Sequence, residues 1–151
     1  MRALIAVLLV AAVAGCGSSH QQTRKPSIAA GDKEACAHLF ARLQQVSAAI
    51  QGSSELIANS LNEQQLSERI AYEQSQLQQA AALMGTGPIP AALRDTNNRL
   101  VAALRTLTAD FERARDPAAR GDFRTAAAAM TDQAAVRQIV AAAKSIEEAC
   151  K

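Results

Sequence analysis

The sequence has few of the aromatic residues that stack on bases or sugars. Among 151 residues there is no tryptophan, one tyrosine and three phenylalanines. Stacking sites for single-stranded nucleic acid depend on such side chains. Neither sign of charge is in large excess, because the chain has 16 lysines and arginines and 14 aspartates and glutamates. Nucleic-acid binding draws on an excess of positive charge, so the composition predicts no nucleic-acid partner.

Signatures of catalysis and of cofactor binding are also missing. The only two histidines, His20 and His38, are too few for a metal site without a cluster of carboxylates. The chain lacks the Glu-x-x-His of di-iron bundles and the Cys-x-x-Cys-His of covalent haem. It also lacks a Gly-x-Ser-x-Gly motif and a glycine-rich phosphate loop. We therefore expect no enzyme, no catalytic residue, no cofactor and no metal.

No stretch alternates with the period of a β-strand, and apolar residues instead repeat at spacings of three and four. This period is typical of antiparallel helices in a bundle. The repeats are Cys36, Leu39, Leu43, Val46 and Ile50; Leu66, Ile70, Glu73, Leu77, Ala80 and Met84; Leu93, Asn97, Leu100, Leu104, Leu107, Phe111 and Ala114; then Phe123, Ala127 and Met130, followed out of phase by Val136, Ile139, Ala143, Ile146 and Cys150. The pattern predicts an all-α, up-down-up-down four-helix bundle over residues 32–151.

Capping and breaking residues set the expected helix limits. The first helix would run from an N-cap at Asp32 to residues 51–53, and the second would end at residues 85–88. The third would start near Pro90 and stop at residues 116–117. The fourth would start at Asp122 and bend around residues 131–135, because its two halves are out of phase. Residues 53–61 form either a short helical piece or an extension of the second helix.

The N-terminus carries a short apolar run, Ala3–Ala14. Its last two residues begin the motif Val13-Ala14-Gly15-Cys16. Twelve helical residues span about 18 Å, too little for a bilayer core of about 30 Å. The segment resembles a bacterial lipoprotein signal with its lipobox. The resemblance covers residues 1–16 and implies that residues 1–15 are removed and that Cys16 receives a diacylglyceryl group. The alternative is plain secretion after cleavage near Ala14, with Cys16 free.

An acylated Cys16 would anchor the chain to a bacterial membrane on the extracytoplasmic side, since two acyl chains give lasting attachment. Whether that membrane is the inner or the outer one stays open. Residues 16–31 contain glycine, serine and proline, and we expect a flexible tether there.

Once Cys16 carries lipid, Cys36 and Cys150 are an even pair in an oxidising compartment, which predicts a disulfide. Two independent buried thiols are the alternative. The bundle agrees with the disulfide, because four antiparallel helices bring the start of the first and the end of the fourth to the same end. That end would face the membrane, and the turns at the other end would face outward.

Two polar residues, Glu73 and Asn97, occupy apolar positions of the second and third repeats. Counted from the Gly87 turn, they are expected at similar heights near the disulfide end. They would form a polar seam that fixes helix register, with Arg99, Lys144 or Asn97 as partner for Glu73. The alternative is a small polar pocket.

Arg120-Gly121-Asp122 spells a cell-adhesion tripeptide, but such triplets arise by chance. We expect Gly121 to make a turn and Asp122 to cap a helix. Around it, basic and acidic residues balance and predict a solvated mixed surface: Arg113, Arg115, Arg120 and Arg124 against Asp110, Glu112, Asp116 and Asp122.

Two functions follow from these observations. The first is a lipid-anchored, non-enzymatic bundle that presents helix surfaces to another component of the cell envelope. The second is a bundle that binds a small molecule or lipid in a cavity lined by Ile70, Leu77, Leu100 and Leu104. A tightly packed interior with an exposed apolar strip favours the first function, and a cavity of about 300 Å³ or more favours the second.

Overall fold

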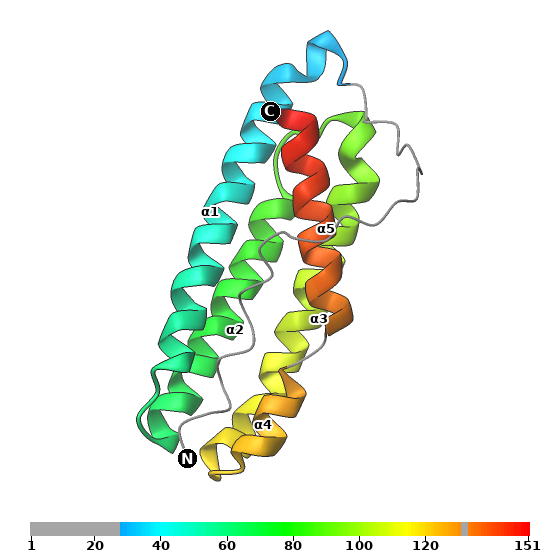
Figure 1. Cartoon of the computed structure of the whole chain (residues 1–151). Helices are drawn as coiled ribbons and strands as arrows, with labels where there is room; N and C mark the ends of the chain where they lie inside the picture. Colours follow the sequence, from blue (N-terminus) through cyan, green and yellow to red (C-terminus); the bar gives the residue numbers. More distant parts are fainter. Residues whose placement is uncertain (1–27, 131–132) are drawn as a thin grey trace, which may run out of the picture.

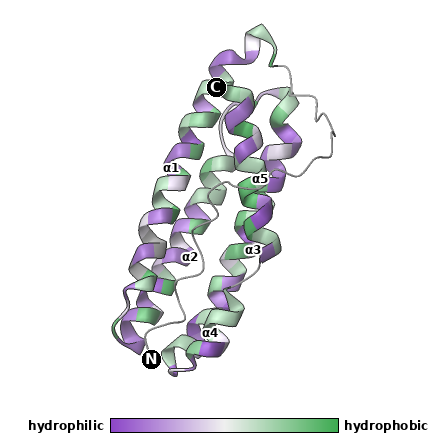
Figure 2. Ribbon diagram, in the orientation of Figure 1, coloured by the Kyte–Doolittle hydropathy of each residue, from purple (hydrophilic) through white to green (hydrophobic). Residues whose placement is uncertain are grey.

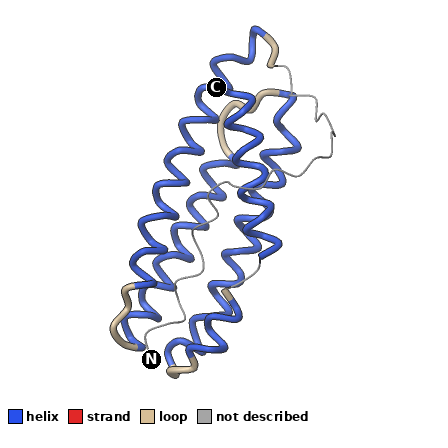
Figure 3. Tube along the Cα trace, viewed as in Figure 1, coloured by secondary structure: helices blue, strands red, loops and turns tan. Residues whose placement is uncertain are grey.

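The computed structural model describes residues 28–130 and 133–151, and the lipobox, Cys16 and His20 lie outside this part of the chain. In the described residues the regular structure is helical throughout (Figure 3). The helices are α1 (Lys33–Ala58), α2 (Glu63–Gly85), α3 (Arg94–Ala119), α4 (Phe123–Ala129) and α5 (Gln133–Cys150), with short 3₁₀ turns η1 (Ala30–Asp32) and η2 (Ala91–Leu93).

The helices pack antiparallel, as predicted, but there are five of them (Figure 1). α2 packs on α1 and α3, while α4 and α5 follow one another along α3 and α5 closes the bundle against α1. The fourth position of the predicted bundle is thus filled by two helices. α4 ends at Ala129 with Met130 as its C-cap and α5 begins at Gln133, so the expected bend near residues 131–135 falls partly outside the described residues.

The predicted repeats face the interior along the first three helices. Figure 2 shows polar and apolar residues alternating along each helix, as expected for helices with one buried face. On α4 the prediction is wrong. Ala126 is the buried residue of this helix, whereas Ala127 is exposed and Phe123 is 48% exposed. The sequence pattern there contains too few large apolar residues to fix the phase of a seven-residue helix.

Two predicted helix ends are wrong. α1 continues through Gly52 to Ala58, where Asn59 follows and its side-chain Nδ2 donates to the Glu55 carbonyl at 2.9 Å. Ile57 of this extension packs against the core. Burial of Ile57 offsets the low helix propensity of glycine and serine. Asp32 occupies the N-cap position of α1, but its side chain makes no capping hydrogen bond.

α3 continues past the predicted stop at residues 116–117 and ends at Ala119. Pro117 lies in the last turn of α3, where its missing N–H removes one backbone hydrogen bond, and the helix ends two residues later. Gly121 follows with a φ of 75°, and Asp122 N–H donates to the Pro117 carbonyl at 2.9 Å. Gly121 N–H donates to Ala118 at 3.1 Å. These two bonds form a Schellman motif, which ends the helix.

Asp122 and Asn62 cap the helices that follow the two turns at this end of the bundle. The Asp122 carboxylate accepts a hydrogen bond from Thr125 N–H at 3.1 Å, and the Asn62 side chain accepts one from Gln65 N–H at 2.9 Å. The side-chain and backbone hydrogen bonds with Thr125 lower the pKa of Asp122 below its ordinary value. The predicted turn and cap at Gly121 and Asp122 are therefore present.

Two glycine substitutions test these helix limits in opposite directions. Gly52→Ala is expected to raise the free energy of unfolding by about 0.5–1 kcal/mol, because Gly52 is an exposed position inside a helix. A methyl group there meets nothing within 4 Å. Gly121→Ala is expected to lower it by about 1 kcal/mol or more, since its φ is positive and its Cβ would lie 2.7 Å from Glu63 Oε1. Urea unfolding measures both. A destabilising Gly52→Ala would contradict the extended α1.

The chain already contacts the bundle before Asp32, the first residue of the predicted domain. Ile28 packs against the core and η1 follows directly. No helix in the described part of the chain combines the length and the apolar character needed to cross a bilayer.

Candidate functional site

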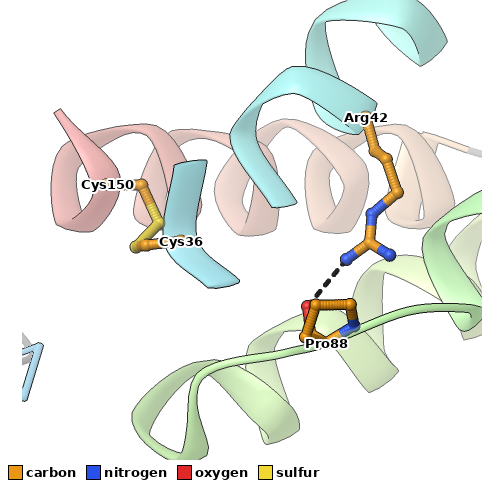
Figure 4. Close-up of a disulfide and its surroundings, with 4 residues drawn as sticks. All are labelled: Cys36, Arg42, Pro88 and Cys150. Carbon is orange, nitrogen blue, oxygen red and sulfur yellow. Dashed lines mark hydrogen bonds between the residues drawn. A yellow bond between two sulfur atoms is a disulfide. The ribbon is translucent and has the colours of Figure 1, made fainter. Parts of the chain in front are cut away.

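A disulfide joins the two ends of the folded chain. Cys36 in the first turn of α1 and Cys150 at the end of α5 are bonded, with Cα atoms 5.3 Å apart across a sequence separation of 114 (Figure 4). Cys36 is buried and Cys150 is half-buried. The predicted pairing and its place at one end of the bundle are both confirmed.

Arg42 ties the loop between α2 and α3 to the same end of the molecule. Its guanidinium donates to the backbone carbonyls of Thr86 and Pro88, the latter at 3.0 Å (Figure 4). Gly87 lies between these carbonyls with a φ of 76°, and a Cβ on it would collide with the Arg42 side chain. Glycine is therefore needed at this close approach. α1, α5 and the 86–90 loop are thus fixed together.

The buried apolar residues form two clusters along the bundle. The proximal cluster, on the disulfide side, contains Cys36, Leu39, Leu43, Val46, Leu77, Ala80, Ala81, Met84, Leu93, Leu100, Val101, Leu104, Leu107, Ala135, Ala142 and Ile146. The distal cluster contains Ile70, Ala114, Ala118 and Ala126. Phe111 is half-buried and packs against both.

Buried polar residues lie where one cluster gives way to the other. On α2, Glu73 and Gln74 lie between Ile70 of the distal cluster and Leu77 of the proximal one. On α3, Thr108 and Asp110 lie between Leu107 and Ala114 in the same way. The end of α4 and the start of α5 fall at this boundary too, between Ala126 and Ala135. A polar layer therefore crosses the core at the level where α4 ends and α5 begins.

Glu73 is the main feature of this layer. The residue is 1% exposed, and its Oε2 atom is buried without a hydrogen-bond partner in the described structure. Burial raises the pKa of Glu73 to about 7, because the ionised form loses its hydration. The suggested partners are engaged elsewhere, since Lys144 lies 3.8 Å from Glu148 and Arg99 donates to Thr96.

Asn97 is also buried, but it does not meet Glu73. Its side-chain amide donates to the Met84 carbonyl at 2.8 Å, near the end of α2. Met84 lies eleven residues after Glu73 on the same helix, a rise of about 16 Å. The expectation of similar heights is therefore wrong, because the loop after α2 and the 3₁₀ turn before α3 shift the register. Asn97 fastens the start of α3 to the end of α2.

Asp110 is buried, although the balance of charges around it in the sequence predicted a solvated surface. It is 1% exposed and forms an ion pair with the exposed Arg113. α3 packs against α2, α4 and α5, so it buries more than one stripe. The sequence does carry a sign of this burial. A second set of residues on α3, spaced alternately by four and three, is buried and includes Asp110: Ala103, Leu107, Asp110, Ala114 and Pro117.

The remaining candidate residues do not form a site in the described structure. His38 is exposed, with Nε2 3.7 Å from the Glu34 carboxylate one turn earlier. The described residues contain no group of three or more histidine, cysteine or acidic side chains that could hold a metal ion. Arg120, Gly121 and Asp122 belong to the end of α3, the turn and the cap of α4, as described above.

Two hollows open on the surface. One, of about 510 Å³, lies at the disulfide end and is lined by Asp32, Ala35, Gly87, Pro88, Ile89, Arg94 and Asn98. The other, of about 320 Å³, lies against α2 and α3 and is lined by Gln78, Ala81, Ala82, Arg105 and Thr108. Neither is lined by the apolar residues proposed for a ligand cavity. Those four, Ile70, Leu77, Leu100 and Leu104, are each 0% exposed.

The chain matches no protein-family model, no curated protein and no solved structure.

Proposed function

We propose that this chain is a bacterial lipoprotein, anchored on the extracytoplasmic side of a membrane through a diacylglyceryl group on Cys16. Its helical bundle is a non-enzymatic module that contacts another component of the cell envelope. The lipobox at residues 13–16 supports the anchor. A disulfide between Cys36 and Cys150 is compatible with an oxidising compartment outside the cytoplasm.

The contact function is supported by two exposed apolar residues at the end of the bundle opposite the point where the chain enters α1. We call this end the tip. The chain enters α1 at the disulfide end, and α1 spans about 39 Å. At the far end the turns before α2 and before α4 lie together, because Gly121 adjoins Glu63 (Figure 1). Leu61 and Phe123 of these turns are 86% and 48% exposed. Exposed apolar residues far from an anchor suit contact with a partner.

Removing the lipid site tests the anchor. In a bacterial host, the wild-type chain is expected to incorporate radiolabelled palmitate and to enter the detergent phase of a phase-separation assay. Cys16→Ser is expected to do neither, because the thioether cannot form. The double variant Cys36→Ala, Cys150→Ala keeps Cys16 and serves as the control for loss of a cysteine. A Cys16→Ser chain that still carries label and partitions with detergent contradicts the proposal.

A photo-crosslinking amino acid tests the contact surface in intact cells. Placed at Leu61 or Phe123, it is expected to give the same crosslinked partner. Placed at Val140, which is 61% exposed on α5, it serves as a matched control and is expected to give little of that product. Crosslinks from Val140 alone would move the contact to the side of the bundle. A bound small molecule with no crosslink from any position would favour the ligand-binding alternative.

A further inference from the structure

The two ends of the bundle are held by unequal interactions. The proximal part contains the Cys36–Cys150 disulfide, the Arg42 bonds to the 86–90 loop and the larger apolar cluster. Among the side chains that the structure describes, the fully buried apolar residues of the distal cluster are one isoleucine and three alanines, Ile70, Ala114, Ala118 and Ala126, and the larger residues packed against them are only partly buried. Because alanine buries little apolar area, the distal part gains less free energy from packing. Such parts of a protein open at lower free energy than the rest.

Glu73 lies at the boundary of these two parts. Its Oε2 atom is buried without a hydrogen bond in the described structure, so the ionised carboxylate has nothing to replace its lost hydration. Separation of the distal helices around Ile70, which lies about one turn before Glu73 on α2, would let water reach the carboxyl.

The ionisable residues on the helices around this boundary include Glu55 of α1, Arg69 of α2, Asp110 and Arg113 of α3, Arg124 of α4 and Arg137 of α5. Arg113 pairs with Asp110, Arg69 donates to Ser60 Oγ at 3.3 Å, and Arg137 donates to Gln133. Glu55 is exposed. None of the ion pairs between described residues includes Glu73.

We propose that Glu73 makes the distal part of the bundle a pH-responsive element, which opens locally more often when the carboxyl ionises than when it is protonated. The disulfide-linked proximal part stays folded in both states. Opening exposes Ile70 and Leu66 beside the tip residues Leu61 and Phe123, and so enlarges the apolar surface at the end opposite the disulfide.

The way in which pH changes local opening follows from the protonation of Glu73 in the closed and in the open bundle. The pKa of Glu73 is about 7 in the closed bundle and returns toward its ordinary value of 4.5 when water reaches it. The closed state is therefore favoured at low pH, and its advantage falls as the pH rises toward 7. Between pH 5.5 and pH 8.5 this linkage predicts a rise of about 30-fold in the equilibrium constant for local opening.

Amide hydrogen exchange of the full chain, with the disulfide intact, measures this opening. Protection factors at pH 5.5 and pH 8.5 are each normalised to the unfolded-chain rate at that pH. Peptides from the start of α2, the end of α3 and α4 are expected to lose protection by roughly 30-fold. Peptides from the first half of α1 and from α5 are expected to change less than about threefold. An unchanged distal part, or an equal loss in both parts, overturns the proposal.

Variants assign the effect to the carboxyl. Glu73→Gln keeps the size of the side chain and cannot ionise, so its distal protection is expected to be independent of pH. Glu73→Leu gives the same test should the amide disturb packing. Glu68→Gln is the matched control, because Glu68 is an exposed carboxylate on the same helix, and it is expected to keep the wild-type response. A pH response that survives in both Glu73 variants assigns the opening to another group and overturns the proposal.

Discussion

Replacing both Cys36 and Cys150 with alanine is expected to lower the free energy of unfolding by about 4–5 kcal/mol. The bond links residues 114 positions apart, so it closes nearly the whole domain into one loop. In the chain-entropy account, a loop of this size strongly restricts the unfolded chain. For a domain of this size the loss corresponds to a fall in melting temperature of about 15 °C.

Urea and thermal unfolding followed by far-UV circular dichroism measure this loss. Wild-type protein treated with a reducing agent is the control, since it lacks the bond but keeps both cysteines, and it should unfold close to the double variant. Alanine is preferred to serine because Cys36 is 3% exposed and a hydroxyl there would add a buried polar group. A loss below about 1 kcal/mol would show that strain or structure in the unfolded chain offsets the entropy term.

Replacing Glu73 with leucine is expected to raise stability by about 2–3 kcal/mol at pH 8 and to change it little at pH 4.5. Burial raises the pKa of Glu73 from 4.5 to about 7 in the folded chain. The folded state therefore retains a proton that the unfolded state releases between these values. The favourable contribution of protonated Glu73 is complete below pH 4.5, falls as the pH rises toward 7, and is lost above it.

The difference in unfolding free energy between wild type and Glu73→Leu, measured in urea at several pH values, isolates this carboxyl from the others. The difference should grow from pH 4.5 to pH 7 and then level off. Glu68→Leu is the control on the same helix and should show no such growth. A difference that is constant across this range would mean that Glu73 has the same pKa in the folded and unfolded chain, contrary to the raised pKa.

Asp122 acts in the opposite direction at lower pH. Its pKa is lowered by the hydrogen bonds with Thr125, so its contribution is present above the ordinary value of 3.8 and is lost as the pH falls. The combined contribution of these two groups is therefore most favourable where Asp122 is ionised and Glu73 is still protonated.

The sequence by itself determined the helical class, the buried faces of the first three helices and the disulfide. The alternating spacing of Leu100, Leu104 and Leu107 is enough to assign a buried face, because the helical period is a local property. The cysteine pair followed from the assignment of Cys16 to lipid, which leaves Cys36 and Cys150 as an even pair, and the expected helix directions agreed with it. Gly121 and Asp122 were readable as turn and cap because both depend on a few neighbouring residues.

Tertiary structure alone decided how far the helices run and which buried polar residues lie at the same level. α1 passes Gly52 because Ile57 finds a packing surface beyond it, and local propensity carries no record of that surface. Asn97 bonds to the Met84 carbonyl, whereas Glu73 lies with Asp110 at the boundary between the proximal and distal clusters. The register between α2 and α3 depends on the loop and the 3₁₀ turn that join them. Glu73 was recognisable as a buried carboxyl from its spacing, but its lack of a partner follows only from the packing of the other helices around it.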